Sequence, residues 1–317
     1  MKKELGIFIL LVVLCTVTAT INPRFLSAAN LTNMANVIGL FGVFSLGLGL
    51  VIITSGIDLS VGSMCALTGV VLAMALTEWH WAWPLAALAV LAIPMLLGWA
   101  HGALITRMKM QPFIVTLCGL LLYRGVARFI AGDSTKGFGE GASFDTLRQI
   151  ASGKLMGLPM PFVILLVTGS ILWVVLHRSV YGRYLFAVGR NEEAARFSGI
   201  NTNLVITVAY VVAGLLTGVS GIMIAFYTNS VAPSNHGNFY ELYGIAAAVL
   251  GGCSLRGGEG SIIGIIIGTA LLQVLQNLVN LLGIPSSLNF AVMGAVVLIG
   301  ALADQWVRMK ASRRVTS

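Results

Sequence analysis

The clearest candidate for nucleophilic chemistry is a serine between glycines, in the run Gly218-Val219-Ser220-Gly221. This run matches the short serine motif of intramembrane proteases, whose serine needs a general base within hydrogen-bond reach. The first histidine that follows it is His236, in a predicted exterior loop rather than in a partner helix. The sequence therefore predicts no catalytic residues and no enzyme.

Motifs for ATP and metal chemistry are missing from the sequence. There is no GxxxxGK[ST] run, so this chain does not bind ATP through a P-loop, and there is no HExxH run for zinc. The 4 cysteines stand in apolar runs without CxxC spacing, which favours buried side chains over a disulfide or a metal site. They are Cys15, Cys65, Cys118 and Cys253. We expect neither a metal nor a cofactor.

Asp58 is an ionisable residue between two apolar runs, with Gly56 and Gly62 on either side. A carboxylate in such a position is costly in a membrane and suggests a function. Three interpretations are open. Asp58 accepts backbone N–H bonds at the start of a helix, it is a structural pivot near a transport path, or it couples a cation as in a secondary transporter.

Residues 260–283 form a predicted helix with two distinct faces. Small residues recur every fourth position, so one face can pack closely against another helix. These are Gly260, Gly264 and Gly268. Amide side chains fall on the opposite face of the same helix. These are Gln273, Gln276, Asn277 and Asn280. An amide face does not suit lipid, so it either bonds to another helix or lines a polar pathway.

The elements that position these residues follow from composition. The sequence has 317 residues, of which 57% are hydrophobic and only 9% are charged, against about 25% charged in an average soluble domain. A soluble fold would need more polar surface, so the surrounding medium is the lipid bilayer. The net charge of +8 comes from scattered basic residues without a basic, aromatic-rich patch. We therefore expect no binding of nucleic acid.

A bilayer core of about 30 Å takes roughly 20 apolar residues as a helix. About ten apolar runs are candidates, so the predicted fold is an all-α polytopic membrane protein, with residues 1–317 as a single domain. The eighth and tenth runs are short, so each is either broken, re-entrant or sheltered by neighbouring helices. The runs are 5–21, 34–54, 61–77, 84–105, 112–131, 161–177, 204–227, 242–254, 261–282 and 288–303.

The distribution of Lys and Arg predicts the orientation, because cytoplasmic loops are enriched in both. If the first run is a retained span, an even number of spans places every basic cluster inside, with both termini cytoplasmic. These residues are Lys2, Lys3, Arg107, Lys109, Arg178, Arg183, Arg190, Arg196, Arg256, Arg308, Lys310, Arg313 and Arg314. Arg124 and Arg128 lie near the outer end of their helix and can snorkel. A place on the transport path stays open for Arg124.

Two predicted loops are long. The exterior loop 132–160 has mixed charge and several glycines, and is either a cap for docking or a mobile loop. The cytoplasmic loop 178–203 contains a short predicted helix, too small to form a core and suited to the groove of a soluble partner. Its N-cap, acidic first turn, alanine face and glycine end are predicted from the helix-capping rules. They are Asn191, Glu192, Glu193, Ala194, Ala195 and Gly199.

The run Glu193-Ala194-Ala195 followed by Gly199 resembles the EAA loop of ABC import permeases, which inserts a coupling helix into a cleft of the ATPase. Four further stretches, in the same order, resemble the ribose, galactose, arabinose and xylose permeases of bacterial ABC importers. They are 55–63, 112–117, 251–260 and 277–283. The resemblance extends from about residue 22 to residue 304. Cys118 and Tyr243 depart from it, standing where many members have glycine and aspartate.

This resemblance implies a multi-pass permease of the bacterial inner membrane that imports a monosaccharide. It also implies three partners: a cytoplasmic ABC ATPase that binds the ATP, a periplasmic sugar-binding protein, and a second permease subunit, identical or not. Glu193 and its neighbours would couple ATP hydrolysis to transport. Asp58, Arg124, Gln273, Asn277 and Asn280 are the candidate residues of the path. A secondary transporter or channel without an ATPase would leave the helix of 188–203 unexplained.

Overall fold

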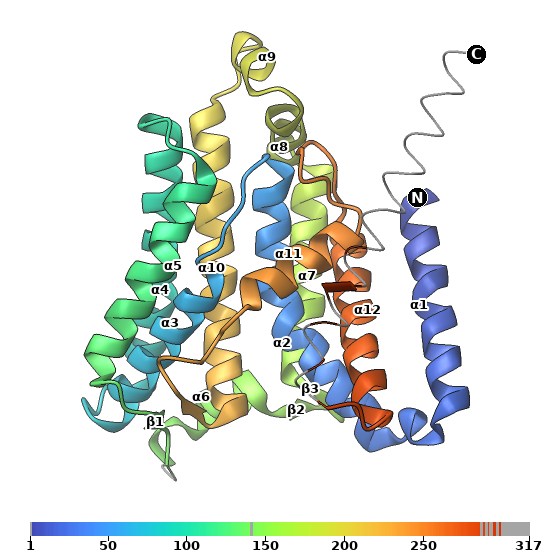
Figure 1. Cartoon of the computed structure of the whole chain (residues 1–317). Coiled ribbons are helices and arrows are strands. Elements are labelled where there is room, and N and C mark those ends of the chain that lie inside the picture. Colours follow the sequence, from blue (N-terminus) through green and yellow to red (C-terminus); the bar gives the residue numbers. More distant parts are fainter. Residues whose placement is uncertain are drawn as a thin grey trace.

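The computed structural model describes residues 2–139 and 142–285, together with positions 288, 291, 294, 295 and 298. Within these residues the chain is a bundle of helices (Figure 1), with strands of only two residues each. The mostly helical, multi-pass class predicted from the sequence is confirmed. The tenth predicted run, 288–303, and the basic C-terminal segment lie outside the described residues, apart from isolated positions.

Seven of the described helices are long and apolar enough to cross a membrane, and each overlaps one predicted run. They are α1 (Lys2–Ile21), α2 (Ala28–Ile53), α4 (Trp83–Arg107), α5 (Pro112–Ala131), α7 (Met160–Arg178), α10 (Thr202–Thr228) and α12 (Ile262–Leu281). The predicted start of α2 at residue 34 is wrong, because the Ser27 side chain caps the helix by accepting a hydrogen bond from the backbone of Asn30. Polar residues therefore fill its first turns.

Two shorter apolar helices complete the interior of the described bundle. α3 (Val61–Thr77) has the predicted bounds, whereas α11 (Tyr240–Leu250) ends before residue 254 because Gly251 caps it and Gly252 has a φ of +91°. A non-helical segment leads into each helix: the first re-entrant segment, residues 54–60, and the second re-entrant segment, residues 232–239. Figure 1 shows that the two segments enter the bundle from opposite ends.

The second re-entrant segment overturns one prediction. We expected residues 228–241 to form an exterior loop, yet His236 is only 8% exposed. The polar and glycine-rich composition of the segment is typical of surface loops. Here the protein itself supplies partners for that backbone inside the bundle, which is the condition for irregular backbone at membrane depth.

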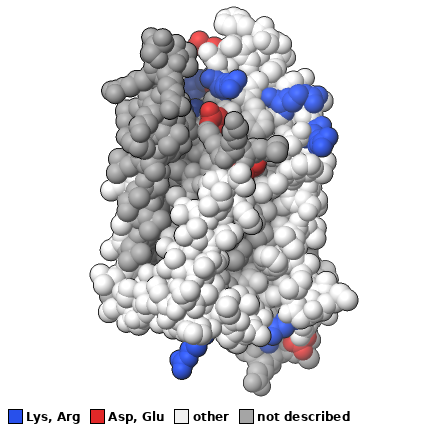
Figure 2. Space-filling view, turned by 90° about the vertical axis from the view of Figure 1, so that its right-hand side faces the viewer, with Lys and Arg blue, Asp and Glu red and all other residues white. Residues whose placement is uncertain are grey.

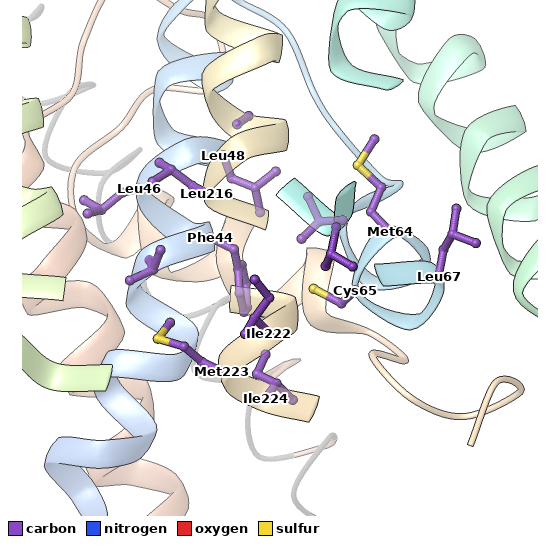
Figure 3. Close-up of a cluster of buried hydrophobic side chains, with 14 of the residues drawn as sticks. Phe44, Leu46, Leu48, Met64, Cys65, Leu67, Leu216, Ile222, Met223 and Ile224 are labelled. Atoms are coloured by element: carbon purple, nitrogen blue, oxygen red, sulfur yellow. The ribbon is translucent and has the colours of Figure 1, made fainter. Parts of the chain in front are cut away.

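The centre of the bundle is an apolar core between α2, α3 and α10 (Figure 3). Phe44 and Leu48 from α2 pack near Met64 and Cys65 from α3, together with Ile222 from α10. All of these side chains are buried. The first re-entrant segment connects α2 to α3, and side-chain packing in this core holds both of these helices in place.

The outer surface is apolar over most of its height. Figure 2 shows Lys, Arg, Asp and Glu gathered toward the two ends of the molecule, with a broad uncharged band between them. Large apolar side chains are exposed on it, including Phe129 at 87%. Exposure of that area to water would cost about 25 cal/mol for each Å², so this band faces lipid. Trp79 and Trp81 lie exposed at one end of the band, as interfacial aromatic residues do.

Cys118 was expected to be buried and is instead exposed on α5. A thiol is a small apolar group that suits lipid as well as a protein interior. Cys65 and Cys253 are buried, and Cys15 is partly buried.

One end of the bundle carries the loop 132–160, and we call it the α6 end. Its elements are η1 (Pro23–Leu26), β1 (Lys136–Gly137), η2 (Ala142–Phe144), α6 (Asp145–Ser152), β2 (Lys154–Leu155), β3 (Leu158–Pro159) and β4 (Ser230–Val231). β1 pairs with β4 and β2 with β3, both antiparallel. Phe138 lies 4.6 Å from Phe226 of α10 between ring centroids. The loop is therefore a packed cap.

An ion pair fixes the start of this cap. The Arg128 guanidinium at the end of α5 bonds to Asp133 at 2.6 Å. This hydrogen bond holds the pKa of the Asp133 carboxyl below its usual value. Arg128 therefore reaches out of the helix end, as snorkelling predicts.

The opposite end carries α8 (Val180–Arg190) and α9 (Glu192–Phe197), and we call it the α9 end. The N-terminus of α1 lies at this same end (Figure 1). The basic clusters around Lys109 and Arg190 lie here too, so the described residues that were predicted to share one side of the membrane do share one end of the bundle.

Candidate functional site

Asp58 lies in the first re-entrant segment and is 2% exposed. Its Oδ1 accepts hydrogen bonds from the backbone N–H of Ser60 at 2.8 Å and from the Ser60 hydroxyl at 2.6 Å. The carboxylate thus fixes the turn that leads into α3. This geometry favours the first of the three interpretations, a carboxylate that accepts backbone N–H bonds at a helix start.

Polar aromatic residues from three helices surround this segment, and the sequence reasoning missed them. The Tyr210 hydroxyl of α10 donates to the backbone oxygen of Ile57 at 3.0 Å. His101 of α4 shares a hydrogen bond of 2.7 Å with the Tyr123 hydroxyl of α5. The other ring nitrogen of His101 is buried without a partner in the described part of the chain. Single polar rings inside apolar runs were the signal that could have identified them.

Arg124 holds the second re-entrant segment. Its guanidinium donates to the backbone oxygen of Pro233 at 3.0 Å and to that of His236 at 2.5 Å. Two backbone carbonyl groups that lie outside helices and strands obtain a hydrogen-bond donor in this way. Arg124 therefore does not snorkel, and it reaches inward from α5 to a segment that begins more than a hundred positions further along the chain.

The start of α11 supplies a buried carboxylate to the start of α3. The Glu241 side chain accepts a backbone hydrogen bond from Gly62, the second residue of α3. A negative group at a helix N-terminus is stabilised by the partial positive charge of the unpaired N–H groups there. Glu241 interacts electrostatically with both Arg124 and Asp58, so these three charged residues belong to one interior cluster.

The second re-entrant segment meets the start of α3 backbone to backbone beside this cluster. A Cβ atom placed on Gly62 would lie 2.1 Å from the backbone oxygen of Gly237, and one placed on Gly237 would lie 2.2 Å from that of Gly62. Gly237 also has a φ of +74°. Only glycine fits at both positions. Helices broken inside the bundle, with their starts directed at each other, are typical of transporters.

The predicted amide face of α12 contacts other helices. The Gln276 amide donates to the Tyr243 hydroxyl of α11 at 3.2 Å. Asn277 and Asn30 of α2 exchange two hydrogen bonds, of 2.8 and 3.2 Å. Gln273 is buried and Asn280 is exposed. Gln276 and Asn277 therefore join α12 to α11 and α2, and none of these hydrogen bonds reaches the cluster around Asp58 and Arg124.

The predicted glycine face is only partly as expected. Gly264 and Gly268 approach α11 closely, because a Cβ atom on each would lie 2.0 Å from the oxygen of Gly251 and 2.2 Å from that of Ala247. Gly260 is not on this helix, which begins at Ile262 after the N-cap Ser261. The prediction that glycines and amides lie on opposite faces of the helix is also only partly correct, since Gln276 bonds to α11, the same helix that the glycines contact.

At the α9 end, the short helix projects from the bundle. The Asn191 side chain accepts a hydrogen bond of 2.9 Å from the backbone of Ala194 and caps α9. Gly199 follows the helix with a φ of +83°, the conformation of a glycine stop. Glu192 bonds to Arg196 and lies 3.7 Å from Lys109. Ala195 is buried, whereas Phe197 is 92% exposed.

A shallow pocket of about 570 Å³ lies beside α9. It is lined by α8, α9 and the loop after α11, including Phe186, Arg190, Asn191, Ala194, Ile200 and Gly258. An aromatic side chain exposed at the end of a projecting helix, with a pocket next to it, is suited to a protein partner because aromatic anchors contribute most of the energy of many interfaces.

A lipid-facing bundle with two helices broken inside it, and with a short helix projecting at one end, defines a membrane transport permease. Over residues 30–301 the chain matches the family described as branched-chain amino acid transport system / permease component, and it belongs to that family. Membership implies an ABC ATPase, a substrate-binding protein and a membrane as partners. The chain is an import permease and not an enzyme.

Curated relatives are similar over nearly their whole length. The chain is 38% identical to the ribose import permease protein RbsC of Escherichia coli K12, over 93% of this chain and 92% of the relative. It is 37% identical to the protein of the same name from Bacillus subtilis, over 96% and 93%. It is 33% identical to the autoinducer 2 import system permease protein LsrD of Klebsiella pneumoniae, over 96% and 94%. No solved structure matches the chain.

Proposed function

We propose that this chain is the transmembrane permease subunit of an ATP-driven importer for a monosaccharide in the bacterial inner membrane. The observation that carries the proposal is the likeness over more than nine-tenths of the chain to permeases named for ribose import. The chemistry agrees, since ordered polar groups in the interior suit a neutral, hydroxyl-rich solute better than a strongly charged one.

The ATPase binds at the α9 end, which is the cytoplasmic one. Asn191, Glu193 and Gly199 shape the coupling loop, and α9 projects where a soluble partner reaches it. Phe197 inserts into the ATPase as the main apolar anchor. ATP is bound and hydrolysed entirely in that partner, and the permease performs no covalent chemistry.

The α6 end is periplasmic and receives the sugar-binding protein. Its packed cap offers a surface of mixed charge, with Lys136 bonded to Glu78 at 2.7 Å. The sugar enters a cavity between this chain and a second permease subunit. The ATPase then switches the side to which the cavity opens.

The path is closed where the second re-entrant segment meets the start of α3. Asp58, Arg124 and Glu241 hold this closure, and its opening exposes backbone polar groups that exchange hydrogen bonds with sugar hydroxyls. Of the three candidate amides, Asn277 binds α12 to α2 and Gln273 is buried, whereas exposed Asn280 is available to a solute.

The test is reconstitution of the chain in proteoliposomes with the ATPase and binding protein of the same transport system. Uptake of labelled ribose, galactose, fructose and leucine is measured with and without ATP on the side of the membrane where the ATPase is bound. The proposal expects ATP-dependent uptake of a monosaccharide. Leucine uptake alone would support the substrate in the family description instead, and uptake without ATP would support a secondary transporter.

A further inference from the structure

Three backbone segments converge at a single serine at the α9 end. The Ser55 Oγ lies 3.0 Å from the backbone oxygen of Gly189 and 2.9 Å from that of Arg256. Next to it, the Gly258 N–H donates to the oxygen of Ile53 at 2.9 Å. Ile53 ends α2 and Ser55 lies in the first re-entrant segment. Gly189 lies in the last turn of α8, and Arg256 and Gly258 belong to the loop between α11 and α12.

The backbones of these segments approach closely, although Ser55 itself is exposed. A Cβ atom on Gly189 would lie 1.8 Å from the oxygen of Ile53, and one on Gly257 would lie 2.0 Å from the Ser55 Oγ. Ser55 itself has a φ of +64°, and Gly257 one of +80°. A side chain held in the left-handed region is uncommon and persists where its surroundings fix it. The three segments are therefore in direct backbone contact, with the Ser55 hydroxyl between them.

Each segment continues into a part of the transport machinery. Two positions beyond Gly189 is Asn191, the N-cap of α9. Three positions beyond Ser55 is Asp58, and α3 starts at Val61. The loop that contains Arg256 joins α11, whose start contacts Gly62, to α12. A displacement of α9 therefore reaches both broken helices through this one junction.

The hydroxyl has one hydrogen to donate and two carbonyl acceptors in reach. It can shift its hydrogen bond from one segment to the other without a change in rotamer. A bond that can be exchanged in this way allows the junction to move while its members stay in contact.

We propose that Ser55 is a positioning residue that transmits movement of the coupling loop to both re-entrant segments. The inference rests on the proposed function, because it needs the ATPase to act on α9. It adds a specific site through which ATP hydrolysis in the partner controls the closure around Gly62 and Gly237.

The test compares Ser55→Ala and Ser55→Gly with unmodified protein in the reconstituted importer. Ser55→Gly removes the hydroxyl and keeps a residue that adopts positive φ without strain, so it folds even if Ser55→Ala does not. Ser170→Ala is the matched control, because that serine is exposed on α7 and its hydroxyl bonds only within its own helix. The measurements are ATPase association, sugar transported for each ATP hydrolysed, and thermal unfolding in detergent.

A second measurement follows movement of the second re-entrant segment, to which Ser55 is proposed to transmit the displacement of α9. Asn238→Cys is introduced into the second re-entrant segment, where residue 238 is exposed, in a Cys118→Ser background that removes the exposed thiol. Labelling by a small thiol reagent is compared between nucleotide-free and ATP-bound complexes. A merely structural serine would not alter how this labelling depends on nucleotide.

We expect both Ser55 variants to bind the ATPase normally and to lose about five- to tenfold in sugar transported for each ATP, the effect of one hydrogen bond. We also expect nucleotide-dependent labelling of Asn238→Cys to disappear in Ser55→Gly. Wild-type coupling and labelling in both variants would overturn the proposed role of Ser55. Loss of ATPase binding would overturn it as well, because it would place Ser55 in the docking surface. An unmodified complex without ATP-driven uptake would overturn the proposed function first, and this inference with it.

Discussion

The side-chain amides of Asn30 and Asn277 form a reciprocal pair that joins the first turn of α2 to the last turns of α12. Asn30 also donates to the backbone oxygen of Phe25 at 2.9 Å, so the pair ties in the turn before α2. Two amides that satisfy each other at a lipid-facing helix contact provide both affinity and register.

Replacement of Asn277 by leucine leaves the Asn30 amide without its partner. We expect the free energy of unfolding in detergent micelles to fall by about 1–2 kcal/mol, since interhelical hydrogen bonds in membranes contribute about 0.6–2 kcal/mol. Asn280→Leu is the control, because Asn280 is exposed and one turn away. The double variant Asn30→Leu/Asn277→Leu should recover part of the loss. An equal loss of stability in Asn277→Leu and in the control Asn280→Leu would rule out a specific role for the Asn30–Asn277 pair.

Phe197 should matter for partner binding and not for folding. We expect Phe197→Ala to weaken ATPase association by tenfold or more, because truncation of a central aromatic anchor costs about 2 kcal/mol or more, and to leave the unfolding temperature unchanged. Phe129→Ala is a matched control, since Phe129 is similarly exposed on α5, at the opposite end of the bundle. The measurement is co-purification and surface binding of the ATPase. Unchanged binding with Phe197→Ala would move the ATPase contact away from the end of α9.

Gly199→Val tests the shape of the coupling loop. A β-branched residue resists the φ of +83° at this position, at a cost of roughly 1–2 kcal/mol, and no core surrounds the site to correct it. We expect a folded permease whose ATPase no longer responds to sugar-loaded binding protein. Gly125→Val is the control, because Gly125 lies in open space on α5 without positive φ. Normal sugar-stimulated ATP hydrolysis in Gly199→Val would count against the assignment.

Arg124→Met should release the second re-entrant segment. Two carbonyl groups lose their donor, and each buried acceptor left without a hydrogen bond costs about 1–3 kcal/mol. We expect lower stability, lost transport, and stronger labelling of a cysteine at position 238 without nucleotide. Arg128→Met is the control one turn away, where the guanidinium is exposed. Equal labelling in Arg124→Met and Arg128→Met would show that Arg124 does not hold the second re-entrant segment in place.

Labelling of single cysteines from each side of the membrane checks the orientation. We expect positions 109 and 190 to react from the cytoplasm, and positions 81 and 154 from the periplasm. The bundle places these two pairs at opposite ends. An external position 190 would separate α9 from any cytoplasmic ATPase and would remove the basis of the coupling argument.

Local rules were enough for much of this fold. The bounds of α3 and α5 follow from apolar runs that end at Thr77 and Ala131, and α9 follows from a cap, an acidic first turn and a glycine. These features depend on neighbours within a few positions. They can be predicted from any sequence that contains them.

Most of the interior cluster could not be predicted, because the contacts of Arg124 and Glu241 span long stretches of the chain. Residues 232–239 have the composition of a surface loop, and the burial of Pro233, His236 and Gly237 depends on contacts with Arg124 and Gly62, far away in sequence. Glu241 likewise has no local reason to cap α3. Asp58 is the exception, because a carboxylate that accepts backbone N–H bonds at a helix start was one of the interpretations drawn from the sequence, and the Ser60 N–H is such a donor.

The contact between Gly62 and Gly237 limits how this protein can evolve. A clash between two side chains can be relieved by a shorter residue on either side, which is how paired substitutions arise in most cores. Here each added carbon atom meets the other residue's backbone oxygen, and a glycine cannot be shortened further. No second substitution at the facing position compensates for a first, so each glycine is fixed whatever change the other acquires.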